Sequence, residues 1–215
     1  MLTDPRRIRD NAQERLGNPV NQETLKELFI EQIRDLYDAE KQITKALPKL
    51  AKASESEELA DALREHLEQT EGHVSRLEQV FEIAGAKAKG KPCKGMKGLL
   101  EEGSEAVKEE DKGPMRDLAI IAGCQKVEHY EISAYGTTRT LAERLGLKKA
   151  VDLLQQTENE ESEADEKLTG IATEMYASEL GGEEQEDEEE PEAISAGTSI
   201  RAAGEARSRS RRRAS

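Results

Sequence analysis

Hydrophobic side chains recur every three or four residues along four long segments of this 215-residue chain. Such spacing gathers them on one face of an α-helix, which turns once in about 3.6 residues. The pattern predicts helices over residues 21–52, 54–85, 114–145 and 147–180. The first segment shows it most clearly, with an apolar stripe made of Leu25, Phe29, Ile33, Leu36, Ile43 and Leu47.

Residues with strong positional preferences mark the ends of these segments. The 54–57 sequence SESE is a capping-box pattern, which predicts a helix start at Ser54. Gly85 is suited to a helix C-terminus and Pro114 to a first helical position. Pro48 should kink the first helix or end its last turns, because proline removes a backbone donor.

The connection between the second and third helices, residues 86–113, is long and contains a short amphipathic stretch at 96–102. We expect a short fifth helix there. Each of the four long helices would span roughly 40 Å. The arrangement predicts an all-α fold, an antiparallel four-helix bundle built from two helical hairpins and a long crossover.

Composition supports this fold class and narrows the function. Aromatic residues make up only 3% of the chain and charged residues 36%, which favours a helical bundle over a β-sandwich. The net charge of −14 argues against a bundle that grips nucleic acid through a basic surface. The two cysteines have no metal-type spacing, and no segment reads as a signal peptide or a membrane span. We expect reduced thiols and a cytoplasmic protein that does not bind membranes.

The two ends of the chain lack helical periodicity. Residues 1–20 are polar and Arg-rich and are interpreted as a flexible arm beside the bundle at 21–180. Residues 181–215 begin with the acidic run GGEEQEDEEEPE and finish Ser/Arg-rich, so we expect an acidic-then-basic disordered tail. The arginines of that tail would bind nucleic acid weakly and with strong salt dependence.

Each predicted helix turns ionisable groups toward its apolar face near mid-length. These groups are Glu40 on the first helix, His66 and His73 on the second, Glu128 with Tyr135 on the third, and Glu161 with Asp165 on the fourth. Glu131 and His129 flank the face of the third helix on opposite edges. In an antiparallel bundle, mid-length positions meet in one layer, so Glu40, His66, Glu128, Glu161 and Asp165 should converge.

Two interpretations of this layer stay open. Single glutamates can lie at the bundle rim or pair with lysine or arginine, and single histidines can be hydrogen-bonded core residues. Together, however, several buried carboxylates would each cost several kcal/mol without compensation. Two divalent cations bring about four positive charges, which matches a layer of carboxylates completed by imidazole.

Several motifs resemble those of the YciE/YciF family of ferritin-like bacterial stress proteins. They are LYDAEKQ at 36–42, His66-Leu67, Arg76-Leu77, Cys93-Lys94-Gly95-Met96, VEHYEISAYG at 127–136, Glu160-Glu161 and Asp165. The resemblance covers residues 23–180 and implies a ferritin-like bundle, a homodimer and a dinuclear centre of iron or manganese. It also implies Glu40, His66, Glu128, Glu161 and Asp165 as metal ligands, with Glu131 as the next candidate.

The sequence departs from the paired Glu-x-x-His motifs of better-known ferritin-like enzymes. Thr70 stands where the glutamate preceding His73 would be, and the fourth helix has no histidine. Three functions therefore remain open. The first is a redox enzyme acting on peroxide, oxygen or Fe(II), with Glu128 and Glu161 bridging two metals and Tyr135 orienting a ligand or donating an electron. The second is a non-catalytic metal-binding or structural stress protein, and the third is nucleic-acid association through the tail.

Overall fold

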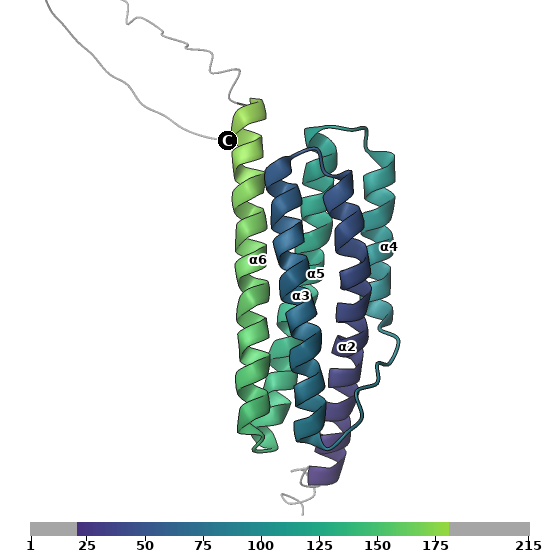
Figure 1. The fold of residues 1–215 in the computed structure, drawn as a ribbon, viewed down its shortest axis with the longest axis vertical. Coiled ribbons are helices and arrows are strands. Elements are labelled where there is room, and N and C mark those ends of the chain that lie inside the picture. Colours follow the sequence, from purple (N-terminus) through teal and green to yellow (C-terminus); the bar gives the residue numbers. More distant parts are fainter. Residues whose placement is uncertain (1–20, 181–215) are drawn as a thin grey trace, which may run out of the picture. The chain divides into compact units, whose positions relative to one another are not determined.

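The computed structural model describes residues 21–180, and the predictions made for residues 1–20 and 181–215 lie outside that range. The described residues form helices and no strands (Figure 1). Their bounds are α2 (Gln22–Ala53), α3 (Glu57–Ala84), α4 (Lys94–Glu109), α5 (Pro114–Arg144) and α6 (Lys148–Leu180). None of them is long and apolar enough to cross a membrane.

The four long helices form two antiparallel hairpins, α2 with α3 and α5 with α6 (Figure 1). The crossover after α3 and helix α4 carry the chain back along the bundle, so α5 runs in the same direction as α3. Helix α4 lies outside the four-helix core, against α5 and α2. The predicted ferritin-like bundle with a long crossover is confirmed.

Helix boundaries agree with the sequence prediction except at three places. Gly85 ends α3 with a left-handed φ of 68°, and Pro114 begins α5, both as predicted. Helix α3 starts at Glu57 rather than Ser54, because the side chain of Ser56 caps it by accepting from the Leu59 amide at 3.3 Å. Pro48 does not end α2, which continues to Ala53.

The third difference is the fifth helix, which the sequence predicted at 96–102 and which spans 16 residues as α4. Its first turn is capped by Cys93, whose Sγ accepts from the Met96 amide at 3.4 Å. Further along, α4 approaches α5 closely at a pair of glycines. A Cβ on Gly123 would lie 3.5 Å from the Cα of Gly103. The missing side chains let the two backbones approach, and α4 continues past the predicted stretch to Glu109.

Acidic residues on α2 hold the crossover in place. The Asp38 carboxylate accepts from the Cys93 amide at 2.8 Å, and Asp35 accepts from Cys93 Sγ at 3.0 Å and Tyr130 Oη at 2.6 Å. Burial raises the pKa of both Cys93 and Tyr130, so both remain proton donors. Cys93 and Cys124 are free thiols, as predicted. The aspartates that point away from the main apolar stripe therefore anchor α4.

A polar layer divides the hydrophobic core into two parts. One apolar cluster includes Phe29, Ile33, Leu77, Phe81 and Leu154, and the other includes Ile43, Leu47, Leu63, Ile121 and Leu168. Between them lie Glu40 on α2, His66 and His73 on α3, Glu128 and Glu131 on α5, and Glu161 on α6, all of them buried. The predicted mid-length layer of inward polar groups is present in the bundle.

The N-terminus of α3 depends on a buried carboxylate from α5. Asp117, only 1% exposed, accepts from the Glu55 amide at 3.0 Å and from the Ser56 amide at 2.7 Å. We expect Asp117→Ala to lower the free energy of unfolding by about 1–3 kcal/mol, since two amides lose their acceptor. Denaturant unfolding checks this, with the exposed Asp152→Ala as control. Equal midpoints for the two variants would contradict it.

Candidate metal centre

Two overlapping groups of side chains in the polar layer have the composition of metal-binding sites. One consists of Glu40, His73 and Glu161, and the other of His66, Glu128 and Glu161. Within each group, one donor atom from every residue lies within 4.8 Å of the others. Because Glu161 belongs to both, the groups form one continuous centre with ligand atoms from α2, α3, α5 and α6.

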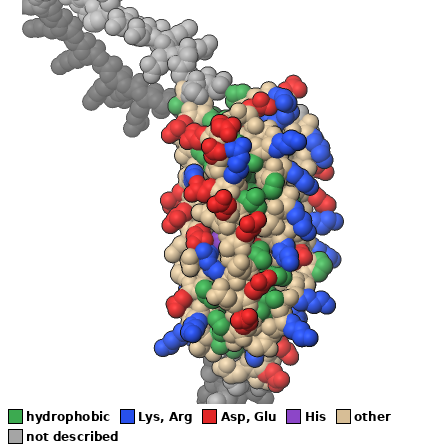
Figure 2. Space-filling model, in the orientation of Figure 1, with side chains coloured by type: hydrophobic (Ala, Val, Ile, Leu, Met, Phe, Trp, Pro, Cys, Tyr) green, Lys and Arg blue, Asp and Glu red, His purple; other side chains and the backbone are tan. Residues whose placement is uncertain are grey.

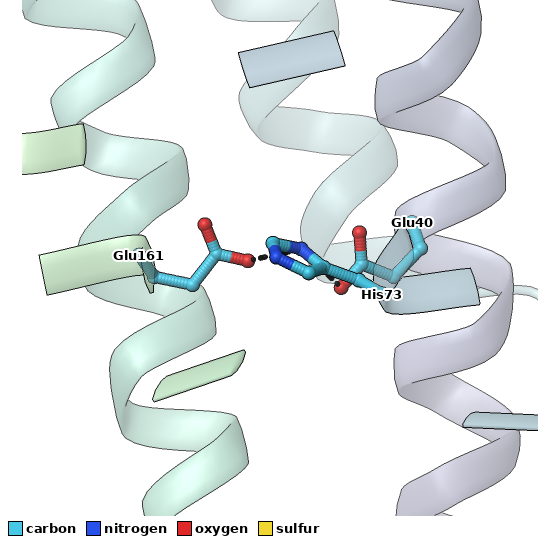
Figure 3. A group of neighbouring side chains, drawn as sticks. All are labelled: Glu40, His73 and Glu161. Atoms are coloured by element: carbon cyan, nitrogen blue, oxygen red, sulfur yellow. Dashed lines mark ion pairs between the residues drawn. The ribbon is translucent and has the colours of Figure 1, made fainter. Parts of the chain in front are cut away.

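The first group is arranged around the ring of His73, which points between α2 and α6 (Figure 3). Its Nδ1 atom lies 2.9 Å from Glu161 Oε1 and 3.5 Å from Glu40 Oε1. Neither the imidazole nor either carboxylate is exposed to solvent. The geometry presents one nitrogen and two carboxylate oxygens to a common point inside the bundle.

A carboxylate outside this group orients His73. Its Nε2 donates to Glu160 Oε2 at 2.9 Å, and both terminal nitrogens of Arg76 bind the same carboxylate at 2.7 Å. Burial alone would raise the pKa of Glu160, but the Arg76 guanidinium holds that pKa below its usual range. Glu160 therefore stays ionised and accepts from Nε2, which leaves Nδ1 to face the centre. Metal-binding histidines are commonly held by such a carboxylate.

The second group follows the same design with a neutral partner. His66 Nε2 lies 3.4 Å from Glu128 Oε1 and 3.7 Å from Glu161 Oε2. The other ring nitrogen, Nδ1, lies 3.2 Å from the side-chain oxygen of Gln69. If Nδ1 donates to that oxygen, the lone pair of Nε2 is directed at the carboxylates. Both histidines thus turn one nitrogen inward and use the other for orientation.

Polar atoms of the centre are left without hydrogen-bond partners. Among the described residues, buried side-chain nitrogen and oxygen atoms that lack such a partner are concentrated here, with Arg34 Nε the exception. They are Glu40 Oε2, His66 Nε2, His73 Nδ1, Glu128 Oε2, Glu131 Oε1, and Glu161 Oε1 and Oε2. Of these, His73 Nδ1 and Glu161 Oε1 lie 2.9 Å apart and form an ion pair when the imidazole is protonated. Buried polar groups are normally satisfied, so the carboxylate oxygens that stay without a hydrogen bond indicate a missing partner of positive charge.

Proton affinities in the layer reflect its burial and crowding. Burial, followed by the charges of neighbouring carboxylates, raises the pKa of Glu128 and Glu131 well above the usual range. Burial would lower the pKa of His73, but the adjoining Glu161 and Glu40 carboxylates outweigh it and raise that pKa to about 11. Burial also acts to raise the pKa of Glu161, which His73 nevertheless holds below its usual range. Without a metal, protons hold together a centre that contains four carboxyl groups.

Tyr135 and Glu131 complete the layer on α5. Tyr135 is fully buried and donates through its hydroxyl to Glu40 Oε1. Its ring also lies edge-on to that of His73, with centroids 6.4 Å apart. Glu131 is 1% exposed and lies at the interior rather than at the edge of the helix face where the sequence put it. The charges of Glu40, Glu161 and Glu128 add to the effect of burial on its pKa.

One residue predicted to converge on the layer is held elsewhere. Asp165 accepts from the side-chain amide of Gln125 at 3.1 Å and lies 3.5 Å from His129 Nε2. Its side chain remains 20% exposed, and it belongs to neither group of potential ligands. His129 lies at the surface, as its position at the edge of the face predicted. The structure therefore brings together Glu40, His66, Glu128, Glu131 and Glu161, and leaves Asp165 at the rim.

The sequence did not identify the roles of His73, Glu160 and Arg76. His73 was predicted to lie on the inward face of its helix, but it was not among the implied metal ligands, since a single histidine can be a hydrogen-bonded core residue. In the structure, the Thr70 hydroxyl donates to the His66 carbonyl at 2.8 Å. The carboxylates of the centre come from the other helices. The available signal was the spacing of His73 and Arg76, which lie on one side of α3 opposite Glu160.

Comparison with known proteins links the chain to a bacterial family. A family model described as a domain of unknown function, DUF892, matches residues 24–181. Protein YciF of Escherichia coli strain K12 is 47% identical over 154 residues, which cover 71% of this chain and 93% of that protein.

Solved structures agree with this relationship. The crystal structure of the E. coli stress protein YciF matches with a TM-score of 0.69, covering 71% of this chain and 96% of that one. YcfI of Rhodopseudomonas palustris, whose description names it a candidate structural protein, is 40% identical. Its TM-score is 0.67, over 71% of this chain and 97% of its own. A Xanthomonas campestris protein, 17% identical with a TM-score of 0.56, shares the fold.

The raised pKa of Glu131 predicts a pH effect in the metal-free protein. A carboxyl group that keeps its proton in the folded state but ionises in the unfolded chain destabilises the fold as pH rises above about 4.5. We expect Glu131→Gln to reduce the loss of unfolding free energy between about pH 5 and about pH 8. The exposed Glu68→Gln is the control. Denaturant unfolding at both pH values in chelator tests this, and parallel pH profiles for wild type and Glu131→Gln would contradict it.

Proposed function

Since the chain belongs to the DUF892 family, and its relatives include a stress protein, we propose that it is a dinuclear metal protein of the bacterial stress response. Iron or manganese would occupy the centre, and the chemistry would involve peroxide, oxygen or Fe(II). The observation that carries the proposal is the concentration of unpartnered carboxylate oxygens and imidazole nitrogens in one buried layer.

The donor set fits these ions. Carboxylate oxygen and imidazole nitrogen suit divalent iron and manganese, whereas sulfur donors would favour softer ions. Two divalent ions carry about four positive charges. That charge balances Glu40, Glu128, Glu131 and Glu161 once they are ionised. Metal binding would then release the protons that otherwise hold the layer together.

Residues of the layer would hold the two ions. Glu161, which belongs to both groups, would be shared by them, and Glu128 is the second candidate for a shared ligand. Glu40 and His66 would each bind one ion, and His73 would take the place that the sequence gave to Asp165. When bound, the two ions supply or accept the electrons for redox chemistry on peroxide, oxygen or Fe(II).

The surrounding residues would prepare the centre for this chemistry. The Tyr135 hydroxyl holds one oxygen of Glu40 and so directs the other toward the centre. The Arg76–Glu160 pair orients the His73 ring. Because Nε2 donates to Glu160, that nitrogen would remain protonated when Nδ1 loses its proton to bind a metal. The apolar clusters on both sides of the layer exclude bulk water.

A second candidate function is a metal-binding or structural stress protein without turnover. The candidate structural role in the description of YcfI favours it, and so does the position of the layer, where a bound metal would cross-link four helices. A homodimer and a cytoplasmic location remain predictions of the sequence. Weak nucleic-acid binding through the Arg-rich tail concerns residues outside the described range.

Metal content tests the ligand assignment. After anaerobic Fe(II) loading and desalting, we expect about two iron ions per chain. Glu161→Ala should abolish retention, and His73→Ala should lower it, because each removes a donor that the bundle cannot replace. Asp165→Asn and the exposed His129→Ala are matched controls that should keep the wild-type content. Elemental analysis measures iron, and less than about half an ion per wild-type chain would refute the site.

Peroxide consumption separates the two candidate functions. We expect the iron-loaded protein to consume hydrogen peroxide, and Glu128→Ala to lose this activity. Tyr135→Phe should slow it by about tenfold or more while iron content is retained, because the hydroxyl acts through Glu40. An oxygen-electrode or absorbance assay follows the reaction. Full metal content without peroxide consumption or Fe(II) oxidation would favour the structural role.

A further inference from the structure

Helices α2, α4 and α5 line a cavity of about 570 Å³, open to solvent on one side, that the dinuclear centre alone does not require. Its size falls in the range of about 300–1,000 Å³ that is typical of ligand sites. The walls are largely apolar and include Ile43, Leu47, Leu50, Leu100, Val107 and Val127. A cavity of this size and character is suited to an organic molecule rather than to an ion or a peroxide.

The cavity is long in the direction of the helices. Its lining residues run from Gln42 to Leu50 on α2 and from Ile120 to Glu128 on α5. Eight residue steps at about 1.5 Å give a length of about 12 Å along each helix. On α4 the lining runs from Lys97 to Lys108. A groove bounded by parallel helix walls over this length suits a linear chain better than a compact ring.

The inner end of the cavity reaches the candidate metal centre at Glu128. The same residue lines a second cavity of about 130 Å³ between α3 and α6, together with His66, Gln69 and Lys167. The smaller cavity has room for a few water-sized molecules. The centre thus has a small approach of mixed polar and apolar lining on one side and a large apolar one on the other. Small reactants have a route of their own, which leaves the large cavity for a different ligand.

The outer end of the cavity carries two lysines. Lys49 on α2 and Lys108 on α4 line it there, opposite Glu128, and Glu105 lines it one turn before Lys108. Among the side chains that the structure describes, which do not include Glu109, no carboxylate lies within ion-pair distance of either ammonium, whereas Lys97 pairs with Glu101 at 3.4 Å. Figure 2 shows Lys and Arg side chains along the edge of the bundle formed by α4 and α2. In a chain with a net charge of −14, this edge is suited to an anionic group.

We propose that this cavity binds a long-chain carboxylate. The alkyl chain lies along the apolar walls and points toward Glu128, and the carboxylate remains at the outer end beside Lys49 and Lys108. Burial of the alkyl chain supplies the affinity, and the two lysines set the direction, because they attract the carboxylate to the outer end. Binding itself does not need a metal. The further statement that the bound chain is presented to the centre rests on the proposed function.

Dodecanoate, kept below its micelle concentration, is the probe, and calorimetry with the full-length protein measures saturable binding. Ala46→Phe on α2 and Ser104→Phe on α4 each place a ring in the cavity from opposite walls. We expect each to weaken binding by about tenfold or more, because the ring takes the volume of the alkyl chain. Ala122→Phe adds the same ring at an exposed position of α5 outside the cavity and should leave the affinity unchanged.

Charge reversal tests the orientation. The Lys49→Glu, Lys108→Glu double variant should weaken dodecanoate binding while dodecanol binds as before. Reversal of two exposed lysines on α6, Lys148→Glu with Lys149→Glu, should change neither affinity. If the double variant binds dodecanol and dodecanoate with equally reduced affinity, the lysines do not bind the carboxylate, and the proposed orientation is wrong.

The site would be overturned by absence of saturable dodecanoate binding to the wild type. It would also be overturned if Ala46→Phe, Ser104→Phe and Ala122→Phe bound dodecanoate with equal affinity. If the wild type does not bind and Ala46→Phe and Ser104→Phe change the subunit number by analytical ultracentrifugation, the groove belongs to a second copy of the chain. Dodecanoate binding to protein that retains no iron would support this site while refuting the dinuclear centre, so the two failures are distinguishable.

Discussion

The arrangement of this bundle depends on one constraint, the burial of four carboxyl groups in a layer across its middle. Charges removed from water cost several kcal/mol each unless opposite charge or hydrogen bonds compensate them. Within the protein, compensation comes from His73, from the Tyr135 hydroxyl and from protons retained by Glu128 and Glu131. It is incomplete, since unpartnered atoms remain. The polar layer therefore lowers the free energy of unfolding of the metal-free protein, and bound cations would offset this loss.

The crossover and α4 are attached to the bundle by polar contacts where they meet and by an apolar face, from which Met96 is buried and Leu99, Leu100 and Val107 pack against the core. The carboxylates of Asp35 and Asp38 hold Cys93 at the start of α4, and the glycine pair at 103 and 123 sets how closely α4 approaches α5. Along this stretch and past the glycine pair, α4 lines a cavity with α2 and α5 that ends at Glu128. The same connection that returns the chain along the bundle also creates a compartment beside the polar layer.

Much of the candidate centre was predictable from helical periodicity. Glu40, His66, Glu128 and Glu161 fall on the apolar faces of their own helices, and a helical wheel of each single helix locates such positions well. The helical wheel was wrong for Asp165, which falls on the correct face but lies at its edge, where Gln125 and His129 contact it. It also underestimated the burial of Glu131, which depends on the neighbouring helices. A wheel describes direction about one axis and contains no information on how closely other helices approach that direction.

The sequence by itself determined the helices, the two hairpins with their long crossover, and the polar layer, because these follow from local periodicity and from residues that start or stop helices. The tertiary structure alone decided which polar groups meet. His73 faces the centre because Glu160 and Arg76, which are far from each other in sequence, hold its outer nitrogen. The length of α4 and the cavity beside it depend on contacts with α2 and α5. Such pairings depend on the packing of whole helices, which no local pattern encodes.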